Sequence, residues 1–438
     1  MSPVDNNAFI VYIISVTFIK GQSALSSMIQ YILWGISFVT LWLTLVWLNF
    51  LYADPAPKKH FKVFPKITFG IPAHNEEETI LKTISSILDA DYPSDKKEII
   101  VVDDGSTDNT ASVVRQFAAS HSNIKVFSKP NGGKASALNI AFEHASGEFF
   151  SVMDADSRIS KESVKLSLEN FTDDKIGAVI SRVRVDAPKN FLERIQRFEY
   201  IMSSMIRKIM CNFGTLSITP GVLSIYRMSV LREVGGFTKD AQNLTEDLEI
   251  AMRLKFYGYL IKMEPRSITY THVPRTLSQL WGQRVRWARG YIYNHVKYAK
   301  MFFSQKHGLF GLFQLPVNVL VVLLLIANIG IIAYDLLNRS FDFVFRSFTI
   351  PDYFWTRITD IPSVQQFVLG NNVQVSFPII VGFALGLYLI YFAHKFFQEQ
   401  FRKQITPLVA YMLIMPYFST LNWISSIVKE VSRSKRKW

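Results

Sequence analysis

The segment Ser151-Val-Met-Asp-Ala-Asp-Ser157 marks the end of a buried strand and the start of a charged turn. Residues 148–153 are rich in large apolar side chains, which predicts a core strand, and Asp154 and Asp156 follow. Two carboxylates so close together cannot both be buried without a counter-charge. Mg²⁺ prefers one or two carboxylates together with substrate phosphate oxygens, so a divalent cation is one interpretation. The alternative is an acidic turn without a ligand, because Asp-x-Asp is common in sequences.

Long apolar tracts flank the centre of the chain and predict a membrane protein. Hydrophobic residues make up 49% of the 438 residues. Tracts without Asp, Glu, Lys or Arg cover residues 21–53, 308–334, 361–394 and 404–428. Each contains an apolar core near the ~20 residues that a helix needs to cross a bilayer.

Two apolar segments leave the topology open. Residues 8–19 are too few for a clear span. Three interpretations of this run stay open: it crosses the membrane, it lies at the membrane surface, or it does neither. No basic segment precedes them and no small-residue cleavage site follows, so we expect no removable signal peptide. In the last tract, Pro407 and Pro416 interrupt the apolar run. A further crossing there would put the basic C-terminal tail on the side of the membrane that the positive-inside rule disfavours. A broken or re-entrant segment is the alternative.

The net charge of +13 comes from basic residues placed beside the apolar tracts. These residues are Lys58, Lys59, Lys62 and Lys66 after the first tract, and Lys429, Arg433, Lys435, Arg436 and Lys437 at the end of the chain. This arrangement follows the positive-inside rule and favours anionic lipid headgroups, so nucleic-acid binding is not needed to explain the charge. The one cysteine, Cys211, excludes an internal disulfide and a cysteine-rich metal site.

Strands and helices alternate between the flanking tracts. We expect strands near 67–71, 98–102, 124–127, 148–153, 176–185 and 222–226, and helices near 79–90, 190–210 and 246–257. This order predicts a Rossmann-like α/β domain with a mainly parallel sheet and ligands at the carboxyl ends of its strands. The acidic turns at 103–108 and 154–156 fall at such ends, so we expect them to converge on one site.

Residues 276–299 predict one amphipathic helix. Its expected apolar stripe consists of Leu277, Trp281, Val285, Ala288, Ile292, Val296 and Ala299, and its opposite side carries Gln283, Arg286, Trp287 and Gly290. A helix lying in the membrane interface and an ordinary core helix are the two interpretations.

Four further polar clusters accompany Asp154 and Asp156. They are Pro72-Ala-His-Asn-Glu76, Asp103-Asp-Gly-Ser106, Asn131-Gly-Gly-Lys134 and Thr245-Glu-Asp247. The glycines before Lys134 let the backbone approach an anion. Thr245 or Asp247 has a structural explanation as a helix cap. The sequence lacks G-x-G-x-x-G, H-E-x-x-H and G-x-S-x-G, which argues against dinucleotide, zincin and serine-hydrolase chemistry.

The ordered set of Asp-Asp-Gly-Ser (103–106), Asp-Ala-Asp (154–156), Thr-Glu-Asp (245–247) and Gln283-Arg-Val-Arg-Trp287 resembles the D, DxD, TED, QxxRW signature of membrane-integrated family 2 glycosyltransferases. These include poly-N-acetylglucosamine, hyaluronan and cellulose synthases. The resemblance covers roughly residues 67–293. Residues 131–138 are most similar to the corresponding segment of poly-N-acetylglucosamine synthases, because hyaluronan synthases usually carry Arg where this chain has Ala135.

The resemblance implies an α/β GT-A catalytic domain inserted between N- and C-terminal transmembrane helices. The expected division is 1–57 for the N-terminal membrane segment, 58–273 for the GT-A domain, 274–307 for an interfacial helix with QxxRW, and 308–438 for the C-terminal membrane region. It also implies inversion at the anomeric carbon and a divalent cation, Mg²⁺ or Mn²⁺.

Site residues carry over from the family position by position. Asp103 and Asp104 would hold the uridine, Lys134 and Asp154 the donor, Asp154 and Asp156 the metal, and Arg286 the departing diphosphate. Asp247 would be the general base, and Gln283, Trp287 and Glu246 would bind the acceptor. Thr219-Pro-Gly221 lies where relatives line the acceptor path, although it departs from the cysteine-bearing motif of cellulose synthases.

The expected function is a processive synthase that elongates a polysaccharide from a UDP-sugar, with UDP-N-acetylglucosamine the leading donor, and passes it through its own spans. Single transfer to a membrane lipid is the alternative, and a nucleotide-binding transporter or scaffold is a third hypothesis. Expected partners are the donor, a growing glycan or lipid acceptor and membrane lipids, whereas accessory export subunits stay open. We expect a plasma-membrane protein with its catalytic domain in the cytoplasm.

Overall fold

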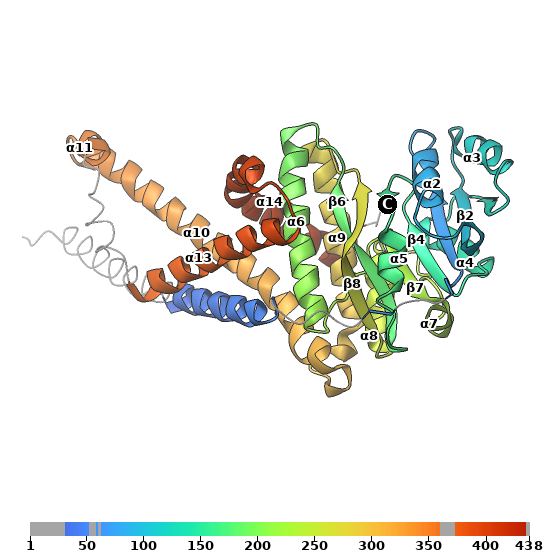
Figure 1. Cartoon of the computed structure of the whole chain (residues 1–438). Helices are drawn as coiled ribbons and strands as arrows, with labels where there is room; N and C mark the ends of the chain where they lie inside the picture. The colour runs from blue at the N-terminus through green and yellow to red at the C-terminus, as the bar shows by residue number, and fades with distance from the viewer. Residues whose placement is uncertain (1–30, 52–57, 60–62, 360–372, 435–438) are drawn as a thin grey trace, which may run out of the picture. The chain divides into compact units, whose positions relative to one another are not determined.

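The computed structural model describes residues 31–51, 58–59, 63–359 and 373–434 (Figure 1). The chain divides into two compact units, and the division falls after Asn49, Val322 and Tyr391. The larger unit runs over Phe50–Val322 and resumes at Phe392. The apolar run predicted at residues 8–19 lies outside the described residues.

An eight-stranded sheet forms the centre of the larger unit, in the order β3-β2-β1-β4-β7-β6-β8-β5. The strands are β1 (Ile67–Ala73), β2 (Lys97–Asp104), β3 (Ile124–Lys129), β4 (Phe149–Met153), β5 (Arg158–Ile159), β6 (Ile176–Val185), β7 (Val222–Arg227) and β8 (Leu260–Thr271). Strands β1 to β4 pair in parallel, as do β6 and β8, whereas β7 and β5 are antiparallel to their neighbours. The predicted mainly parallel sheet is confirmed, and the six expected strands are present together with β5 and β8.

Helices cover both faces of this sheet (Figure 1). They are α2 (Ile80–Leu88), α3 (Thr110–Ala118), α4 (Lys134–Glu143), α5 (Ser163–Leu168), α6 (Phe191–Asn212), α7 (Met228–Glu233), α8 (Glu246–Phe256) and α9 (Leu277–Lys297). One apolar core packs α2, α3 and α5 against the sheet, and a second core packs α4, α7 and α8. With both faces covered, every residue of the inner strand β2 is buried. The acidic residues Asp103 and Asp104 lie at the end of this strand.

Helix α9 begins with a capping box in which the Thr276 hydroxyl accepts a hydrogen bond from the backbone of Gln279 at 3.3 Å. Its predicted apolar stripe is only partly correct. Val285 and Ala288 are buried, but Leu277 and Val296 are 63% and 72% exposed. Arg289, Asn294 and His295 are buried instead. The reason is that α9 packs on two sides, against the start of α8 and against α14 (Ile405–Val431).

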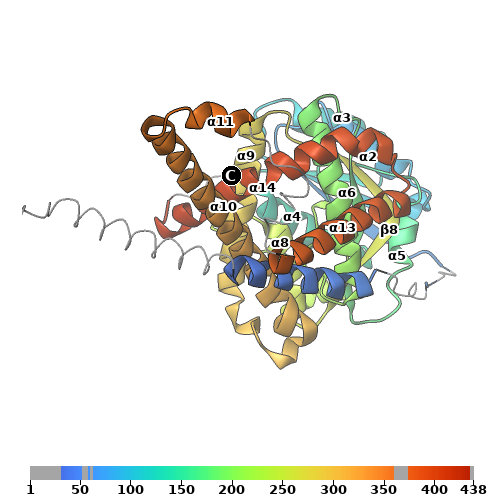
Figure 2. The same cartoon turned by 90° about the vertical axis from the view of Figure 1, so that its left-hand side faces the viewer.

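Helix α14 is continuous, which excludes the alternative of a segment broken at Pro407 or Pro416. Pro407 lies in the first turn, where a missing N–H breaks no intrahelical hydrogen bond, and Pro416 lies within the helix. Figure 2 shows α14 crossing α6, with which it is in contact. Ring contacts link α14 to α9: Trp281 with Phe418, and Tyr291 with Trp423, each with centroids 5.5 Å apart. Arg289 and Glu430 form an ion pair near its end.

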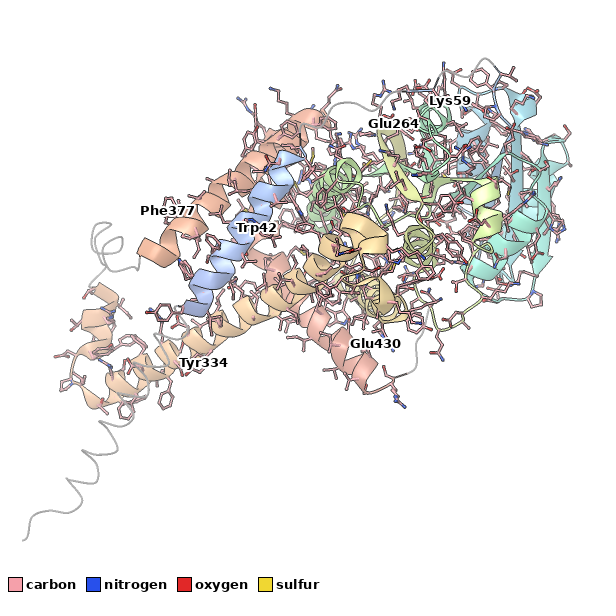
Figure 3. The ribbon with its side chains drawn as sticks, turned by 90° about the horizontal axis from the view of Figure 1, so that it is seen from below. Trp42, Lys59, Glu264, Tyr334, Phe377 and Glu430 are labelled. Carbon is pink, nitrogen blue, oxygen red and sulfur yellow. The ribbon has the colours of Figure 1, made fainter. Side chains whose placement is uncertain are left out.

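The smaller unit consists of helical segments. It contains the helix Tyr31–Asn49, most of α10 (Leu315–Thr349), α11 (Tyr353–Thr359) and most of α13 (Val373–Phe396). Figure 3 labels Tyr334 of α10 and Phe377 of α13, whose side chains are 43% and 62% exposed. Four helical segments of the described chain are long and apolar enough to cross a membrane: Tyr31–Asn49, Phe310–Thr349, Phe377–Phe396 and Phe401–Val431.

Close packing of β1 against β4 predicts a stability defect in Gly70→Ala. A Cβ at Gly70 would lie 2.5 Å from Cζ of the buried Phe150 ring. Overpacking of this kind costs about 1–3 kcal/mol, so we expect the melting temperature of the purified full chain to fall by several degrees. Gly282→Ala is the matched control, because no atom lies within 4 Å of that Cβ, and it should melt as wild type or slightly higher. Equal melting of Gly70→Ala and wild type would contradict this packing.

Candidate active site

Two loops that follow different strands interlock at the carboxyl edge of the sheet. Asp104, at the end of β2, accepts a hydrogen bond from the Gly132 backbone at 2.9 Å and pairs with Lys129. Gly105 has φ +73°, and a Cβ there would lie 2.7 Å from the Asn131 nitrogen. The Asp-Asp-Gly and Asn-Gly-Gly segments therefore form one continuous surface, and glycine is required where they meet.

The turn after β2 is held by side chains of the first polar cluster. Asp103 accepts a hydrogen bond from the Ser106 backbone at 3.1 Å. The Asn75 side chain accepts one from the Thr107 backbone at 2.8 Å, and the His74 ring lies 3.0 Å from the Asp104 carbonyl oxygen. The strand ends of β1 and β2 are thus joined, as expected for neighbouring parallel strands.

Lys134, the first residue of α4, is the centre of the site. Its ammonium nitrogen lies 2.6 Å from a carboxylate oxygen of Asp154 and 2.8 Å from one of Glu246. The Asp154 backbone donates a hydrogen bond to the Gly221 carbonyl at 2.9 Å. A Cβ at Gly221 would collide with both Lys134 and Asp154, so only glycine leaves room for this ion pair. The ammonium group of Lys134 therefore joins three segments: the start of α4, the start of α8 and the end of β4.

Asp156 lies beside this ion pair in an environment that disfavours its charge. Burial, followed by the Asp154 carboxylate, raises its pKa, and the Ser157 hydroxyl donates to it at 3.1 Å. No group of three or more His, Cys, Asp or Glu side chains among the described residues is placed to hold a metal ion. Two hard carboxylates that repel each other nevertheless fit a divalent cation completed by ligand phosphate oxygens, because Mg²⁺ uses few protein ligands.

Asp247 lies next to Glu246 in the first turn of α8. Burial and then the Glu246 charge raise its pKa to about 6, while Lys134 and Arg286 act in the opposite direction. The Thr219 hydroxyl donates to its backbone carbonyl at 2.8 Å. A carboxylate with a pKa near neutrality suits a proton acceptor. The cap explanation fails for Thr245, whose hydroxyl makes no cap hydrogen bond and accepts one from Asn294 at 3.1 Å instead.

The QxxRW segment of α9 reaches the same site. A Cβ at Gly290 would collide with Thr245, so α9 packs directly on the start of α8. The Arg286 charge acts on Asp247. Trp287 is 37% exposed, and the Arg284 guanidinium lies 4.3 Å from its ring centroid. This leaves an aromatic surface beside the acidic cluster.

Gln283, also on α9, has a buried side-chain oxygen without a hydrogen-bond partner in the part of the chain that the structure describes. Arg284 is held by Glu199 of α6 at 2.9 Å. The unsatisfied oxygen of Gln283 is therefore able to accept a hydrogen bond from a bound hydroxyl.

Helix α6 adds residues that no sequence motif indicated. Tyr200 interacts electrostatically with Arg284 and Asp156, and burial raises its pKa. Arg207, seven positions later, interacts with Tyr200 and Asp247, and burial lowers its pKa. The one available signal was their spacing, which puts both side chains on one side of the helix.

The structure brings most of the predicted site residues together. Interactions through Lys134 connect Asp154, Asp156, Glu246 and Asp247, and Arg286 acts on Asp247. Asp103 and Asp104 belong to the adjoining loop surface, and Gln283 and Trp287 to the same helix as Arg286. Glu246, expected at the acceptor, is 5% exposed and contacts Lys134.

Known proteins resemble this chain in sequence. Residues 68–235 match the model of Glycosyl transferase family 2. The chain is 37% identical over 226 residues to a poly-beta-1,6-N-acetyl-D-glucosamine synthase of Staphylococcus epidermidis, covering 51% of this chain and 54% of the relative. It is 37% identical over 259 residues to a probable glycosyltransferase of Bacillus subtilis, covering 58% and 61%. The matched region thus spans little more than half the length of these relatives.

A mannosyltransferase from Pyrobaculum calidifontis, solved in complex with GDP-Man and Mn²⁺, has a similar structure. It aligns over 94% of this chain and 99% of its own, with a TM-score of 0.59 and 21% sequence identity. At that identity the likeness shows the fold. Together with the strand order and the family match, it confirms the expected GT-A fold.

The central role of Lys134 predicts a pH-dependent defect in Lys134→Met. Without the ammonium, Asp154, Glu246 and Asp247 repel one another, so the melting temperature of the full chain should fall at pH 8. The difference from wild type should narrow toward pH 5.5, because protonation of Asp247, whose pKa is raised to about 6 mainly by burial, relieves the repulsion. Lys161→Met, an exposed lysine, is the control. A defect that is equal at both pH values would contradict the electrostatic account.

Proposed function

We propose, since residues 68–235 match the model of Glycosyl transferase family 2, that this protein is an inverting, metal-dependent β-glycosyltransferase that elongates a polysaccharide from a UDP-sugar. One observation carries the proposal: Lys134 contacts Asp154 of the DxD segment and Glu246 beside Asp247, so donor-binding and base residues share one cation. Relatives named poly-beta-1,6-N-acetyl-D-glucosamine synthase make UDP-N-acetylglucosamine the leading donor.

The loops at the ends of β2 and β3 suit the nucleotide. Asp103 and Asp104 offer carboxylates to the base and ribose. The start of α4 at Lys134 offers backbone N–H and ammonium groups to the diphosphate. Asp154 and Asp156 would hold the cation. When bound, that cation would neutralise the developing charge of the diphosphate.

Asp247 would act as the general base. Its carboxylate takes the proton of the acceptor hydroxyl while that oxygen attacks the anomeric carbon of the donor sugar. The bond between this carbon and the diphosphate breaks in the same displacement, which inverts the configuration. Lys134 and Arg286, both of which act on Asp247 electrostatically, would stabilise the leaving diphosphate.

Trp287 would bind the acceptor sugar. Its exposed ring is fixed by Arg284, which in turn is held by Glu199. The C–H face of a sugar stacks on an indole without needing specific hydrogen bonds, so this platform tolerates a chain that moves after each addition. The Gln283 side-chain oxygen would accept a hydrogen bond from the acceptor.

Helix α14 would lie on the membrane surface and not cross it. It packs on α6 and α9, its buried residues include Met415, Asn422 and Ser426, and the Asn422 side chain donates to the Trp281 carbonyl of α9 at 3.3 Å. A crossing α14 would draw the charged residues of those helices into hydrocarbon, which is costly. With Tyr31–Asn49, α10 and α13 as crossings, the basic C-terminal end lies on the same side as the catalytic domain, which is the cytoplasmic side by the positive-inside rule.

Membrane-impermeant thiol labelling tests this arrangement. In a Cys211→Ser background, Ser432→Cys should be labelled only from the side that also labels Lys161→Cys in the catalytic domain. Asp352→Cys, between α10 and α11, should be labelled from the opposite side. Labelling of Ser432→Cys and Asp352→Cys from the same side would refute the arrangement.

The proposed reaction is tested with the purified full chain in lipid nanodiscs. UDP-N-acetylglucosamine, UDP-glucose and GDP-mannose are supplied separately with Mn²⁺, and the products are sized and digested with linkage-specific hydrolases. We expect a polymer of β-linked N-acetylglucosamine. A glycolipid carrying one sugar would replace this proposal with single transfer, and binding without transfer would overturn the enzymatic assignment.

Asp247→Asn should reduce turnover by at least ~10²-fold and leave donor affinity nearly unchanged, because a general base contributes about 10²- to 10⁴-fold. In the wild type, turnover should rise with pH and level off above about 6, since the base is active only when deprotonated and burial raises its pKa to that value. Asp174→Asn, at an exposed aspartate, is the control. Near-normal turnover of Asp247→Asn would refute the base assignment.

Asp156→Asn should raise the Mn²⁺ concentration needed for half-maximal donor binding by about tenfold or more, because one of two protein ligands loses its charge. Isothermal titration with the UDP-sugar at several Mn²⁺ concentrations measures this shift. Asp95→Asn, 74% exposed in its side chain, should bind as wild type. Metal dependence unchanged in Asp156→Asn would exclude Asp156 as a ligand.

A further inference from the structure

Three arginines converge on one buried carboxylate where the chain leaves α13. Glu399 lies between α13 and the turn Phe401–Gln404, and its side chain is 2% exposed. Its oxygens lie 2.6 Å from Arg182, 3.1 Å from Arg184 and 2.7 Å from Arg197. Arg182 and Arg184 belong to β6 and Arg197 to α6, so the cluster joins three distant parts of the sequence.

The cluster holds more positive charge than Glu399 neutralises. Three guanidinium groups face one carboxylate, and no other carboxylate of the described residues forms an ion pair with them. Arg182 is the buried partner of Glu399: its side chain is 5% exposed, it also donates to the Phe397 carbonyl at 3.1 Å, and its guanidinium lies 4.2 Å from the Phe397 ring centroid. Burial and the neighbouring arginines lower the pKa of Arg182 to about 10, although Glu399 opposes this shift.

Arg184 and Arg197 are the arginines beyond that buried pair. Their side chains are 31% and 23% exposed, so both reach the surface of the protein, unlike that of Arg182. The Nε of Arg197 is buried and has no hydrogen-bond acceptor among the described residues. An additional anion at the exposed part of the Arg184 and Arg197 side chains would offset the surplus charge of this cluster.

The position of the cluster along the chain indicates which anion it meets. The candidate span Phe377–Phe396 ends three residues before Glu399. Lys395, Arg402 and Lys403 around the same turn are exposed. A residue just beyond a span lies at the depth of the lipid headgroups, where anionic lipids attract basic side chains.

We propose that Arg184 and Arg197 bind the phosphate group of an anionic membrane lipid, with Glu399 as the internal counter-charge. Guanidinium groups bind phosphate through paired N–H donors, and two of them from different elements define a site and not merely a charged surface. A bound lipid would connect β6 and α6 to the end of α13. This inference is independent of the proposed reaction, because it concerns lipid binding alone.

The test measures lipid affinity of the purified full chain by native mass spectrometry from mixed micelles, with phosphatidylglycerol against phosphatidylcholine. Arg184→Gln/Arg197→Gln should bind phosphatidylglycerol at least about tenfold more weakly, since charge-assisted hydrogen bonds are the strong ones. Arg115→Gln/Arg232→Gln, at exposed arginines of α3 and α7, removes the same charge and should change the affinity less than twofold. Equal affinity of the two double variants would overturn the proposal.

Glu399→Gln supplies a prediction of opposite sign. Removal of the competing carboxylate should tighten phosphatidylglycerol binding severalfold. If the cluster only stabilised the fold, Glu399→Gln would lower the melting temperature and leave lipid binding unchanged. That second result would overturn the proposal. If the arginine double variant does not fold, Arg184→Gln alone, which preserves the Arg182–Glu399 and Arg197–Glu399 pairs, should still weaken binding about threefold or more.

Inorganic phosphate distinguishes the lipid from a soluble anion. With phosphate added at about ten times the lipid concentration, bound phosphatidylglycerol should be retained, because the acyl chains contribute to its binding. Displacement by phosphate would assign the site to a free anion and overturn the lipid assignment.

Discussion

The site depends on the ammonium group of Lys134, which lies among carboxylates that come from separate segments. It lies 2.6 Å from Asp154 and 2.8 Å from Glu246, and its charge also acts on Asp247 and Asp156. Carboxylates this close repel one another, so their grouping requires a compensating charge. In the proposed reaction, Asp154 and Asp156 would hold a metal ion that helps to neutralise the diphosphate, and Lys134 would exchange its carboxylate partners for phosphate oxygens.

The fold positions these side chains at the carboxyl edge of the sheet and at the first turns of helices. Parallel strands end at one edge of the sheet, so β2 and β4 deliver their acidic turns to neighbouring positions. Glycines then allow close approach where a side chain would intervene: Gly221 at the Lys134–Asp154 pair, and Gly290 where α9 meets α8. Because α9 also packs on α14, the proposed acceptor platform is connected to a helix with an apolar outer face.

Much of this could be predicted from sequence, because alternating strands and helices fix where strand ends meet. The strands near 67–71 and 98–102 and the acidic turns after them follow from local patterns. Helix α9 was harder to predict, since it packs on two sides and buries Arg289 and Asn294, which are not members of the predicted apolar stripe. Tyr200 and Arg207 could not be found, because their role depends on how α6 packs. The continuity of α14 through Pro416 depends likewise on its packing against α6 and α9.

The most direct measurement is a structure of the full chain with Mn²⁺ and a non-transferable UDP-sugar analogue. The account predicts that Lys134 leaves Asp154 for a diphosphate oxygen at hydrogen-bond distance, about 3 Å. Asp154 and Asp156 should face the ion, and the Asp247 carboxylate should face the anomeric carbon on the side opposite the diphosphate. A diphosphate bound elsewhere, with Lys134 still paired to Asp154 and Glu246, would contradict the account.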